Sequence, residues 1–246
     1  MIFRVNHSYD GITRLCADWE YVPAGDRDTV PRTDITDIDI TPDDIAFERE
    51  KDADGHRDAY LETLAMLRLA AEKAAFENVI LFHSSSMLYG GRAYLFTAPS
   101  GTGKTTHCRL WKELLGDNTA FLNGDKPFIR LTADGPVIFG TPWKGKEGYG
   151  GNISAPIGGI CLVGRGTENR VTRADFSEVL PRLIRQTYRP RTAEAYERVM
   201  KSLIATASSV PVFEMSCNIS AEAAAASFEA MTGEKAPQTF RSAKNG

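Results

Sequence analysis

The stretch RAYLFTAPSGTGKTTH, residues 92–107, decides the fold of this 246-residue chain. Its first six residues predict a strand, the small residues after them predict a tight turn, and a helix is predicted from there to about Leu115. Within the helix, Cys108, Trp111 and Leu115 recur at the spacing of one buried face. The sequence therefore predicts a strand, a turn and a helix in direct succession.

Residues 98–105, APSGTGKT, have the spacing of the Walker A motif, with Ala98 in the place of the first glycine. Small residues in such a turn let backbone N–H groups face a phosphate, and the start of the helix adds its positive dipole. We expect Lys104 to reach the β- and γ-phosphates of a nucleotide and Thr105 to bind Mg²⁺. The full set of expected phosphate-binding residues in this turn is Ser100, Gly101, Thr102, Gly103, Lys104, Thr105 and Thr106. The alternative is a glycine-rich turn that binds nothing, which would have no use for Lys104 or Thr105.

An acidic residue follows the next predicted strand, TAFLN at 119–123, in the run Gly124, Asp125, Lys126. A carboxylate at the end of a strand beside a phosphate loop can hold Mg²⁺ or accept the proton of an attacking hydroxyl. We assign both candidate roles to Asp125, with Lys126 as a supporting residue. The alternative is a turn aspartate, because Asn-Gly-Asp favours turns in any protein.

The glycine-rich loop, residues 140–152 (GTPWKGKEGYGGN), offers further charges. Lys144 and Lys146 are expected to neutralise transferring phosphate, and Glu147 to complete the metal shell or orient substrate. Glycine-rich basic loops also occur without a function, so a solvated charged loop is the alternative.

Hairpin connections indicate the type of sheet. The predicted strands at 79–83 and 92–97 are joined by SSSMLYGG, which is too short for a crossover helix, so we expect them to pair antiparallel. A second hairpin is predicted where Asp134-Gly135 separates two apolar runs. The expected fold class is α/β with an α+β tendency, built on a mixed, largely antiparallel sheet.

His83 ends the first of these strands and is therefore expected near the phosphate loop, as a further catalytic candidate. The alternative is a structural histidine, which is the usual role of a lone one. Ser84, Ser85 and Ser86, which come next, are expected to form a loop.

Further strands and helices are predicted before and after the segments described above. Residues 1–56 predict short strands, with Ile38 and Ile40 alternating with polar residues, and a helix is predicted over 57–78. One face of that helix is expected to carry Leu61, Leu64, Ala65, Leu69 and Phe76. A buried strand over 158–165, helices over 175–188 and 192–208, a strand over 210–215 and a helix over 220–231 follow. We expect an N-terminal appendage at 1–78, a P-loop domain at 79–232 and a loose tail at 233–246.

Charge and cysteine usage exclude several classes of function. The formal net charge is −3, so no electrostatic field is expected to gather nucleic acid or an anionic membrane. The four cysteines have no metal-ligand spacing and suggest no disulfide framework. With no signal peptide and no long apolar span recognisable, a cytoplasmic location is expected.

The run HSSSMLYGGRAYLFTAPSGTGKTTH, residues 83–107, resembles the catalytic core of HPr kinase/phosphorylase, whose fold is shared with phosphoenolpyruvate carboxykinase. The resemblance continues through FLNGDKP (121–127) and the GKE of the glycine-rich loop, and more weakly to VPVFEM, so that it covers about residues 79–232. It implies a bound nucleotide with Mg²⁺, phosphate transfer to a hydroxyl and a carboxylate base. Lys104 and Thr105 match the P-loop pair, and His83 matches the upstream histidine.

This sequence departs from the pattern of that family at several points, and these departures limit the substrates and reactions that the resemblance implies. One of its paired aspartates is missing, so Asp125 would combine the base and metal roles, or Glu147 would supply the metal ligand. The late PGRN-type run and a full-length regulatory domain are also missing, which makes HPr a doubtful substrate. Phosphoenolpyruvate carboxykinase is typically about twice this length, and its substrate-binding Arg and Lys set is not recognisable in this sequence, which argues against decarboxylation. Small stand-alone relatives that phosphorylate a serine of a modified-peptide precursor are the nearest functional precedent.

The leading hypothesis is therefore an ATP- and Mg²⁺-dependent kinase acting on a hydroxyl, with a serine of a peptide or small protein as the favoured acceptor. A nucleotide-dependent regulatory or assembly module without a phosphoacceptor is the first alternative, and a small-metabolite kinase or carboxykinase is the second. The sequence does not specify the acceptor, the choice of ATP or GTP, any reverse phosphorylase activity or the oligomeric state, and it leaves a homo-oligomer open.

Overall fold

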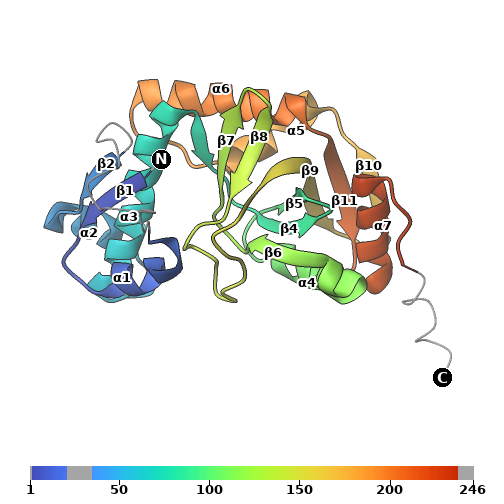
Figure 1. The fold of residues 1–246 in the computed structure, drawn as a ribbon, viewed down its shortest axis with the longest axis horizontal. Coiled ribbons are helices and arrows are strands. Elements are labelled where there is room, and N and C mark those ends of the chain that lie inside the picture. Colours follow the sequence, from blue (N-terminus) through green and yellow to red (C-terminus); the bar gives the residue numbers. More distant parts are fainter. Residues whose placement is uncertain (1, 21–34, 238–246) are drawn as a thin grey trace, which may run out of the picture.

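In a computed structural model of the chain, residues 2–20 and 35–237 are described. They form a mixed α/β fold in which a curled nine-stranded sheet lies beside a smaller N-terminal unit (Figure 1). That unit, residues 2–20 and 35–74, comprises β1 (Ile2–Asn6), α1 (Gly11–Cys16), the 3₁₀ turn η1 (Ala17–Trp19), β2 (Ile35–Asp39), α2 (Pro42–Arg49) and α3 (Asp58–Ala74).

The large sheet is mixed and largely antiparallel, as the sequence predicted. Its strands run in the order β3-β7-β8-β9-β5-β4-β6, and β11 joins β9 with β10 beyond it. Only β5–β9 and β9–β11 pair in parallel within the described sheet. The strands are β3 (Val79–Leu81), β4 (Ser85–Tyr89), β5 (Arg92–Thr97), β6 (Thr119–Asn123), β7 (Phe128–Thr132), β8 (Gly135–Phe139), β9 (Ser154–Arg165), β10 (Arg170–Arg173) and β11 (Val212–Cys217).

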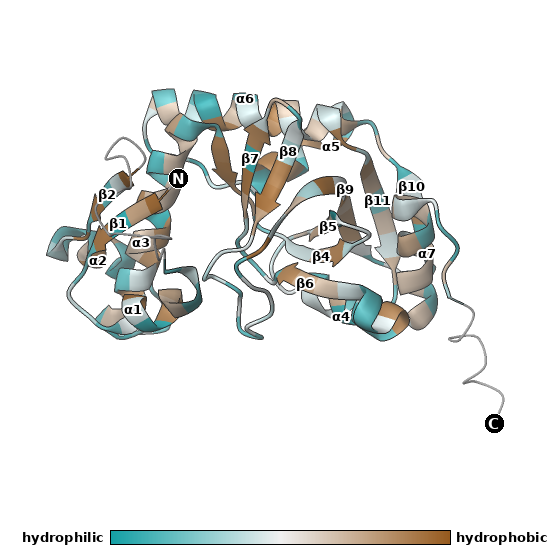
Figure 2. Ribbon diagram, in the orientation of Figure 1, coloured by the Kyte–Doolittle hydropathy of each residue, from teal (hydrophilic) through white to brown (hydrophobic). Residues whose placement is uncertain are grey.

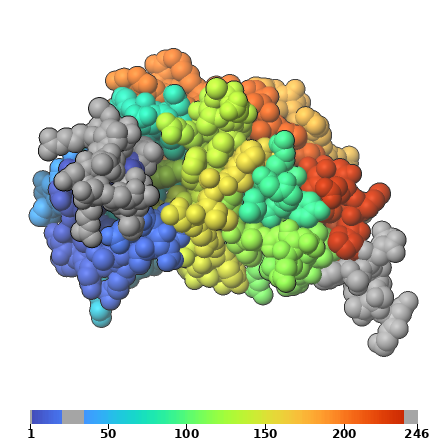
Figure 3. All heavy atoms as spheres, viewed as in Figure 1, coloured from blue at the N-terminus to red at the C-terminus, as the bar shows by residue number. Residues whose placement is uncertain are grey.

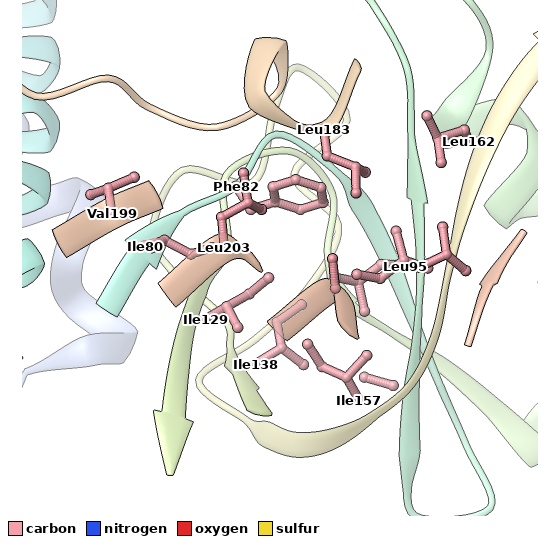
Figure 4. Packing of buried hydrophobic residues seen from close by; sticks show 14 of the residues in the cluster. Ile80, Phe82, Leu95, Ile129, Ile138, Ile157, Leu162, Leu183, Val199 and Leu203 are labelled. Atoms are coloured by element: carbon pink, nitrogen blue, oxygen red, sulfur yellow. The ribbon is translucent and has the colours of Figure 1, made fainter. Parts of the chain in front are cut away.

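Two helix layers cover the two faces of this sheet. Alternate residues of a strand point to opposite faces, so Leu95 of β5 enters one core while its neighbours Tyr94 and Phe96 enter the other. The core around Leu95 is covered by α5 (Phe176–Arg185) and α6 (Ala193–Ser209), and Figure 4 shows Leu183 and Leu203 of these helices packed on the sheet. The opposite core is covered by α4 (Lys104–Leu115) and α7 (Ala221–Thr232). The apolar colouring of the central strands in Figure 2 follows from this double coverage.

Local signals place these helices close to their predicted ranges. The side chains of Asp175, Thr192 and Ser220 each accept a hydrogen bond from the first turn of the helix that follows, which fixes the starts of α5, α6 and α7. The hairpin predicted at Asp134-Gly135 joins β7 to β8, with Thr132 paired to Gly135. The short strand β10 was not predicted.

The predicted pairing of the strands at 79–83 and 92–97 is wrong. β3 pairs with β7, and the antiparallel partner of β5 is β4, which begins inside the segment that was expected to be a loop. Ser85 and Ser86 can be buried in a strand because their hydroxyls donate to the carbonyl oxygens of Gly124 and Asn123, at 2.7 and 3.1 Å. Short hydroxyl side chains therefore produced a loop-like pattern in a buried strand.

The N-terminal unit contains the predicted short strands, but its helices α1 and α2 were not predicted. β1 and β2 pair in parallel, and Ile38 packs with Ala65 and Met66 of α3. Leu61 and Ala65 are buried as expected, whereas Phe76 is 46% exposed because α3 tightens into a 3₁₀ turn at residues 75–77 before it ends. The placement of Phe76 on the buried face was therefore wrong.

The end of the described chain is tied to the core. Glu234 accepts a hydrogen bond from the hydroxyl of Tyr89 at 2.7 Å, whereas residues 238–246 of the predicted loose tail lie outside the described residues. All four cysteines are free thiols. Within residues 2–20 and 35–237, no helix combines the length and apolar character needed to cross a membrane.

Candidate functional site

The turn between β5 and α4, residues 98–103, is the candidate phosphate loop and contains two glycines in a left-handed backbone conformation. Gly101 and Gly103 adopt positive φ angles of 75° and 117°, which residues with a side chain rarely adopt. Open space surrounds both glycines, and α4 begins directly afterwards at Lys104. The N-terminal N–H groups of α4 therefore lie next to a loop whose backbone can approach a ligand closely.

Lys104 lies folded into this loop. Its Nζ atom donates to the carbonyl oxygens of Ala98 and Pro99 at 2.9 and 3.4 Å, and the residue is buried. Burial lowers the pKa of Lys104, and the negative charge of Asp125 acts in the opposite direction. The amine is thus held by weak neutral partners, which an anionic ligand can replace.

Arg165, which the sequence analysis missed, supports the loop from the neighbouring strand. Its Nε atom donates to the carbonyl oxygen of Thr102 at 3.2 Å, and its Nη2 atom donates to that of Gly101. These hydrogen bonds hold the carbonyl groups of Gly101 and Thr102 so that they face Arg165. No local signal marks this residue, because only the parallel pairing of β5 with β9 brings the two segments together.

A serine links the phosphate loop to the strand that carries the candidate base. The Ser85 hydroxyl lies 3.1 Å from Thr105 Oγ1 and donates to the carbonyl oxygen of Gly124 at 2.7 Å. Thr105 is therefore two hydrogen bonds away from the residue that precedes Asp125. Ser85 was expected in a loop and was not among the predicted site residues.

The three predicted catalytic residues meet at this point. His83 Nε2 lies 3.1 Å from Asp125 Oδ1, and Lys126 Nζ lies 2.9 Å from Asp125 Oδ2. His83 Nδ1 is 2.9 Å from Oε1 of Gln186, and the Thr97 hydroxyl at the end of β5 donates to the His83 carbonyl oxygen at 2.8 Å. His83 therefore reaches the loop through Thr97, although its strand is not paired with β5.

The ionisation of Asp125 is set by two opposing effects. Burial raises the pKa of Asp125, but the hydrogen bond from His83 and the charge and hydrogen bond of Lys126 outweigh it, so the pKa lies below its ordinary value. Asp125 is therefore a carboxylate at neutral pH. It can accept a proton or hold a cation without first being ionised.

Asn123 shapes the turn that carries Asp125. Its Oδ1 atom accepts the backbone N–H groups of Asp125 and Lys126, both at 2.9 Å, and its Nδ2 atom donates to the Thr141 carbonyl oxygen at 3.0 Å. The residue is completely buried. The sequence identified Asn-Gly-Asp as a turn but did not identify this role for Asn123.

The backbone of the glycine-rich loop reaches Asp125. A Cβ atom on Gly145 would lie 3.1 Å from Asp125 Cβ, and one on Gly124 would lie 2.4 Å from the Lys144 carbonyl oxygen. The charged side chains of this loop are Lys144, Lys146 and Glu147. Lys144 Nζ lies 5.0 Å from the centroid of the Trp19 ring, and Lys146 and Glu147 are exposed. The structure thus brings the backbone of the loop against Asp125, while Lys144 lies over Trp19 and the part played by Lys146 and Glu147 stays a prediction.

Protein ligands for a metal are few at this site. Within the described part of the chain, no three His, Cys, Asp or Glu side chains are gathered so that they could hold an ion. Thr105 and Asp125 supply oxygen atoms only, which suits Mg²⁺, a cation that proteins usually bind through one or two side chains together with phosphate and water.

A cavity of about 460 Å³ opens on the other side of the phosphate loop. Gly101–Gly103 and Thr106 form one wall, and Leu110 of α4, Arg165, Asn218 and Ile219 are among the residues that form the others. Among the residues that the structure describes, Ile219 is the most exposed large apolar side chain, at 78%. The cavity lies toward β9 and β11, whereas Asp125 follows β6, which lies on the other side of β5 in the strand order.

No protein-family model matches the chain, and the curated proteins contain no match either. A functional conclusion therefore rests on the residues of the site.

Proposed function

We propose that this protein is a P-loop phosphotransferase that moves the terminal phosphoryl group of ATP to a hydroxyl, with a serine of a peptide or small protein as the favoured acceptor. The observation that carries the proposal is the Ser85 bridge, which joins Thr105 of the phosphate loop to the Asp125 turn through hydrogen bonds of 3.1 and 2.7 Å. It brings a phosphate-binding element and an ionised carboxylate to one site, as phosphoryl transfer to a hydroxyl requires.

The residues fit a nucleotide with Mg²⁺. The positive φ angles of Gly101 and Gly103 open the loop to a phosphate, and Lys104 can leave its two carbonyl partners to bind the β- and γ-oxygens. Thr105 Oγ1 and the Asp125 carboxylate would hold Mg²⁺. When bound, the ion would supply positive charge that neutralises the phosphate oxygens.

The two sides of the loop indicate how the nucleotide would lie. The cavity between Leu110 and Ile219 suits the flat apolar faces of a base, and Asn218 offers an amide to its edge. With the base there, the triphosphate would run across Gly101–Gly103 toward Asp125. The terminal phosphate would then face the side on which a hydroxyl acceptor meets the carboxylate.

Asp125 would take the acceptor proton, and its neighbours would keep it ionised. His83 and Lys126 engage one carboxylate oxygen each, which fixes the orientation of the group. Because the pKa of Asp125 is lowered, the carboxylate form persists down to the acid side of the ordinary aspartate value. Any loss of activity between pH 6 and 7 would therefore have to come from another group.

A kinase fold of the HPr kinase type is part of the proposal. The antiparallel strands β4 and β6 lie beside the P-loop strand β5, an arrangement that supports this relationship over a parallel doubly wound sheet. The resemblance over residues 83–107 supports it independently.

One observation favours a second function, a nucleotide-dependent regulatory or assembly module. Asp125 is a single carboxylate, and both of its oxygens are already engaged by His83 and Lys126. Such a module would bind ATP, turn it over slowly and change its conformation or assembly.

The deciding experiment is Mg²⁺-dependent ATP turnover by the wild type and Asp125→Asn, with and without pools of serine-containing peptides and small hydroxyl metabolites. We expect Asp125→Asn to lower acceptor-dependent turnover by about 100-fold or more, the usual contribution of a general base, while ATP affinity stays within a few fold. Asp134→Asn, in the exposed β7–β8 turn, is the matched control and should behave as the wild type.

Full activity of Asp125→Asn would contradict the proposed base. Tight ATP binding without turnover on any acceptor would favour the regulatory module, and sedimentation with and without ATP would then measure its assembly.

A further inference from the structure

The N-terminal unit holds the glycine-rich loop at three points along its length. At its start, the Gly140 carbonyl oxygen accepts the indole N–H of Trp19 at 3.1 Å. At its end, the side-chain amide of Asn152 donates to the Asp18 carbonyl oxygen at 3.2 Å. Between them, Lys144 Nζ lies over the Trp19 ring. In Figure 3 the blue N-terminal segment lies directly against the yellow part of the chain that includes the end of this loop.

A second tryptophan, this time from the loop itself, enters the N-terminal unit. Trp143 packs against the cluster that contains Met66 and Ala70, and its indole N–H donates to the Thr63 carbonyl oxygen of α3 at 3.2 Å. Its own carbonyl oxygen accepts the backbone N–H of Lys126 at 3.2 Å. Trp143 therefore connects α3 to the Asp125 turn through one residue.

The other side of the same loop rests on the candidate base. Gly145 lies close to Asp125, because a Cβ atom at this position would be only 3.1 Å from Asp125 Cβ. Gly124 lies against the Lys144 carbonyl oxygen. A loop containing five glycines has little order of its own, because glycine retains more backbone freedom than any other residue. Its path next to Asp125 therefore depends on the elements that hold it: β6 on one side, through the Gly151 N–H bond to the Leu122 carbonyl oxygen at 3.2 Å and the stacking of Tyr149 on Phe121, and the N-terminal unit on the other.

We propose that the N-terminal unit is a positioning element for phosphoryl transfer, in which Trp19 and Trp143 clamp the glycine-rich loop against the Asp125 turn. This inference rests on the proposed function for its catalytic consequence only. Trp19 and Trp143 are positioning residues, since they act on Asp125 and Lys126 through the loop. The clamp acts on the Asp125 turn and not on residues 98–105, so we expect it to affect the transfer step more than nucleotide binding.

The clamp is tested first without any ligand, on the full chain. Trypsin can cut the loop after Lys144 and Lys146, and the initial rate of these cuts, identified by mass spectrometry, reports how often the loop opens. We expect Trp19→Ala to raise that rate by about tenfold and Trp19→Phe, which keeps a ring under Lys144 but loses the indole N–H, to raise it less. Tyr60→Ala, which removes an exposed ring of the same unit that stacks on His56, is the matched control and should leave the rate unchanged.

The catalytic consequence is tested on the same variants. We expect Trp19→Ala to lower kcat for ATP turnover by about tenfold while the KM for ATP stays within about twofold, with Trp19→Phe in between. A substitution that only destabilises the whole protein would lower the fraction of active enzyme, but it would not accelerate cleavage after Lys144 and Lys146 more than cleavage elsewhere. Unchanged loop cleavage would overturn the clamp, and faster cleavage with unchanged kcat would overturn its role in transfer. A wild type that turns over no ATP would overturn the proposed function and the catalytic role together, and the cleavage rates would still decide the clamp.

Discussion

The buried amide of Asn123 shows how one uncharged side chain can organise a charged site. It satisfies the N–H groups of Asp125 and Lys126 and donates to Thr141, so it fixes both the turn and the strand end facing it. Removing it would take this partner from the Asp125 N–H and the Thr141 carbonyl oxygen, whereas the Lys126 N–H would keep its bond to the Trp143 carbonyl oxygen.

We expect Asn123→Ala to lower the free energy of unfolding by about 2 to 3 kcal/mol, because several hydrogen bonds of a completely buried side chain are lost together. Urea denaturation measures this loss. Asn118→Ala, in the exposed 3₁₀ turn before β6, is the control and should change the free energy of unfolding by less than about 0.5 kcal/mol. A similar small change for Asn123→Ala would show that the turn does not depend on the amide.

A buried histidine of α4, which lines the cavity beside the phosphate loop, controls how stability responds to acid. His107 of α4 is buried 2.8 Å from the Ser227 hydroxyl of α7, and burial lowers its pKa from 6.5 to about 4. Between these two values the unfolded chain binds a proton that the folded chain does not. The stabilising effect is therefore complete above pH 6.5 and is lost as the pH falls toward 4.

We expect His107 to account for a loss of up to about 3 kcal/mol of unfolding free energy between pH 7 and pH 4, on top of the loss from other groups. His107→Gln, which can still donate to Ser227, should have a flatter pH dependence, measured by urea denaturation at several pH values. His7→Gln, at an exposed position, should keep the wild-type slope. Equal slopes for His107→Gln and the wild type would contradict the neutral, buried state.

The local sequence pattern was enough to predict the positions of some residues of the candidate site but not of others. The turn between β5 and α4 could be predicted because its signal lies within eight consecutive residues, and the place of Asp125 and Lys126 because they follow a strand, whereas phosphate binding by this turn stays a prediction. Ser85, Asn123, Arg165 and Gln186 could not, because each acts on residues that are distant or on backbone atoms whose positions are set by the fold. The expected approach of Lys146 and Glu147 to the site stays a prediction.

At the level of elements, the β4–β5 hairpin explains how the P-loop strand acquires an antiparallel neighbour. Tyr89 pairs with Arg92 across Gly90 and Gly91, whose φ angles are 55° and 72°. Two-residue hairpin loops favour two positive φ angles because their twist matches that of the strands. The GG pair was thus the signal for a hairpin two residues long, and the error in the predicted pairing came from treating all of SSSMLYGG as the connection.

We expect Gly90→Val to lower the free energy of unfolding by about 1 to 2 kcal/mol, because a β-branched residue strongly disfavours a positive φ. Gly90→Asn should cost clearly less, since asparagine tolerates this conformation, as Asn78 does at a φ of 56°. Nothing lies within 4 Å of a Cβ at this position, so steric contact is not the cause. Equal losses for the two variants in chemical denaturation would contradict the conformational explanation.

For the molecule as a whole, the candidate nucleotide cavity is assembled from three parts of the chain far apart in sequence. The phosphate loop and α4 supply one wall, the end of β9 supplies another, and Asn218 and Ile219 between β11 and α7 supply the third. The parallel pairing of β9 with both β5 and β11 brings these parts together. Ile219 is exposed at the mouth of this cavity, and in the proposed function it would contact the base of a bound nucleotide.

We expect Ile219→Ser to weaken ATP binding by about tenfold, because the base would lose an apolar contact. Inorganic triphosphate, which has no base, should bind the variant and the wild type equally. Because the side chain is 78% exposed, the free energy of unfolding should change by less than about 0.5 kcal/mol. Calorimetric titration measures both affinities, and an equal loss for both ligands would place the base elsewhere.

The sequence by itself determined helices α3 to α7, most of the strands, the mixed and largely antiparallel character of the sheet, and the turn between β5 and α4. Those features depend on the periodicity of apolar residues and on turn and cap residues, which act over a few positions along the chain. Only the tertiary structure decided which strands pair, that Arg165 and Ser85 support the loop, and that two tryptophans tie the N-terminal unit to the glycine-rich loop. The physical reason is that these contacts join residues tens of positions apart through backbone carbonyl groups, which are the same in every residue and leave no mark in the sequence.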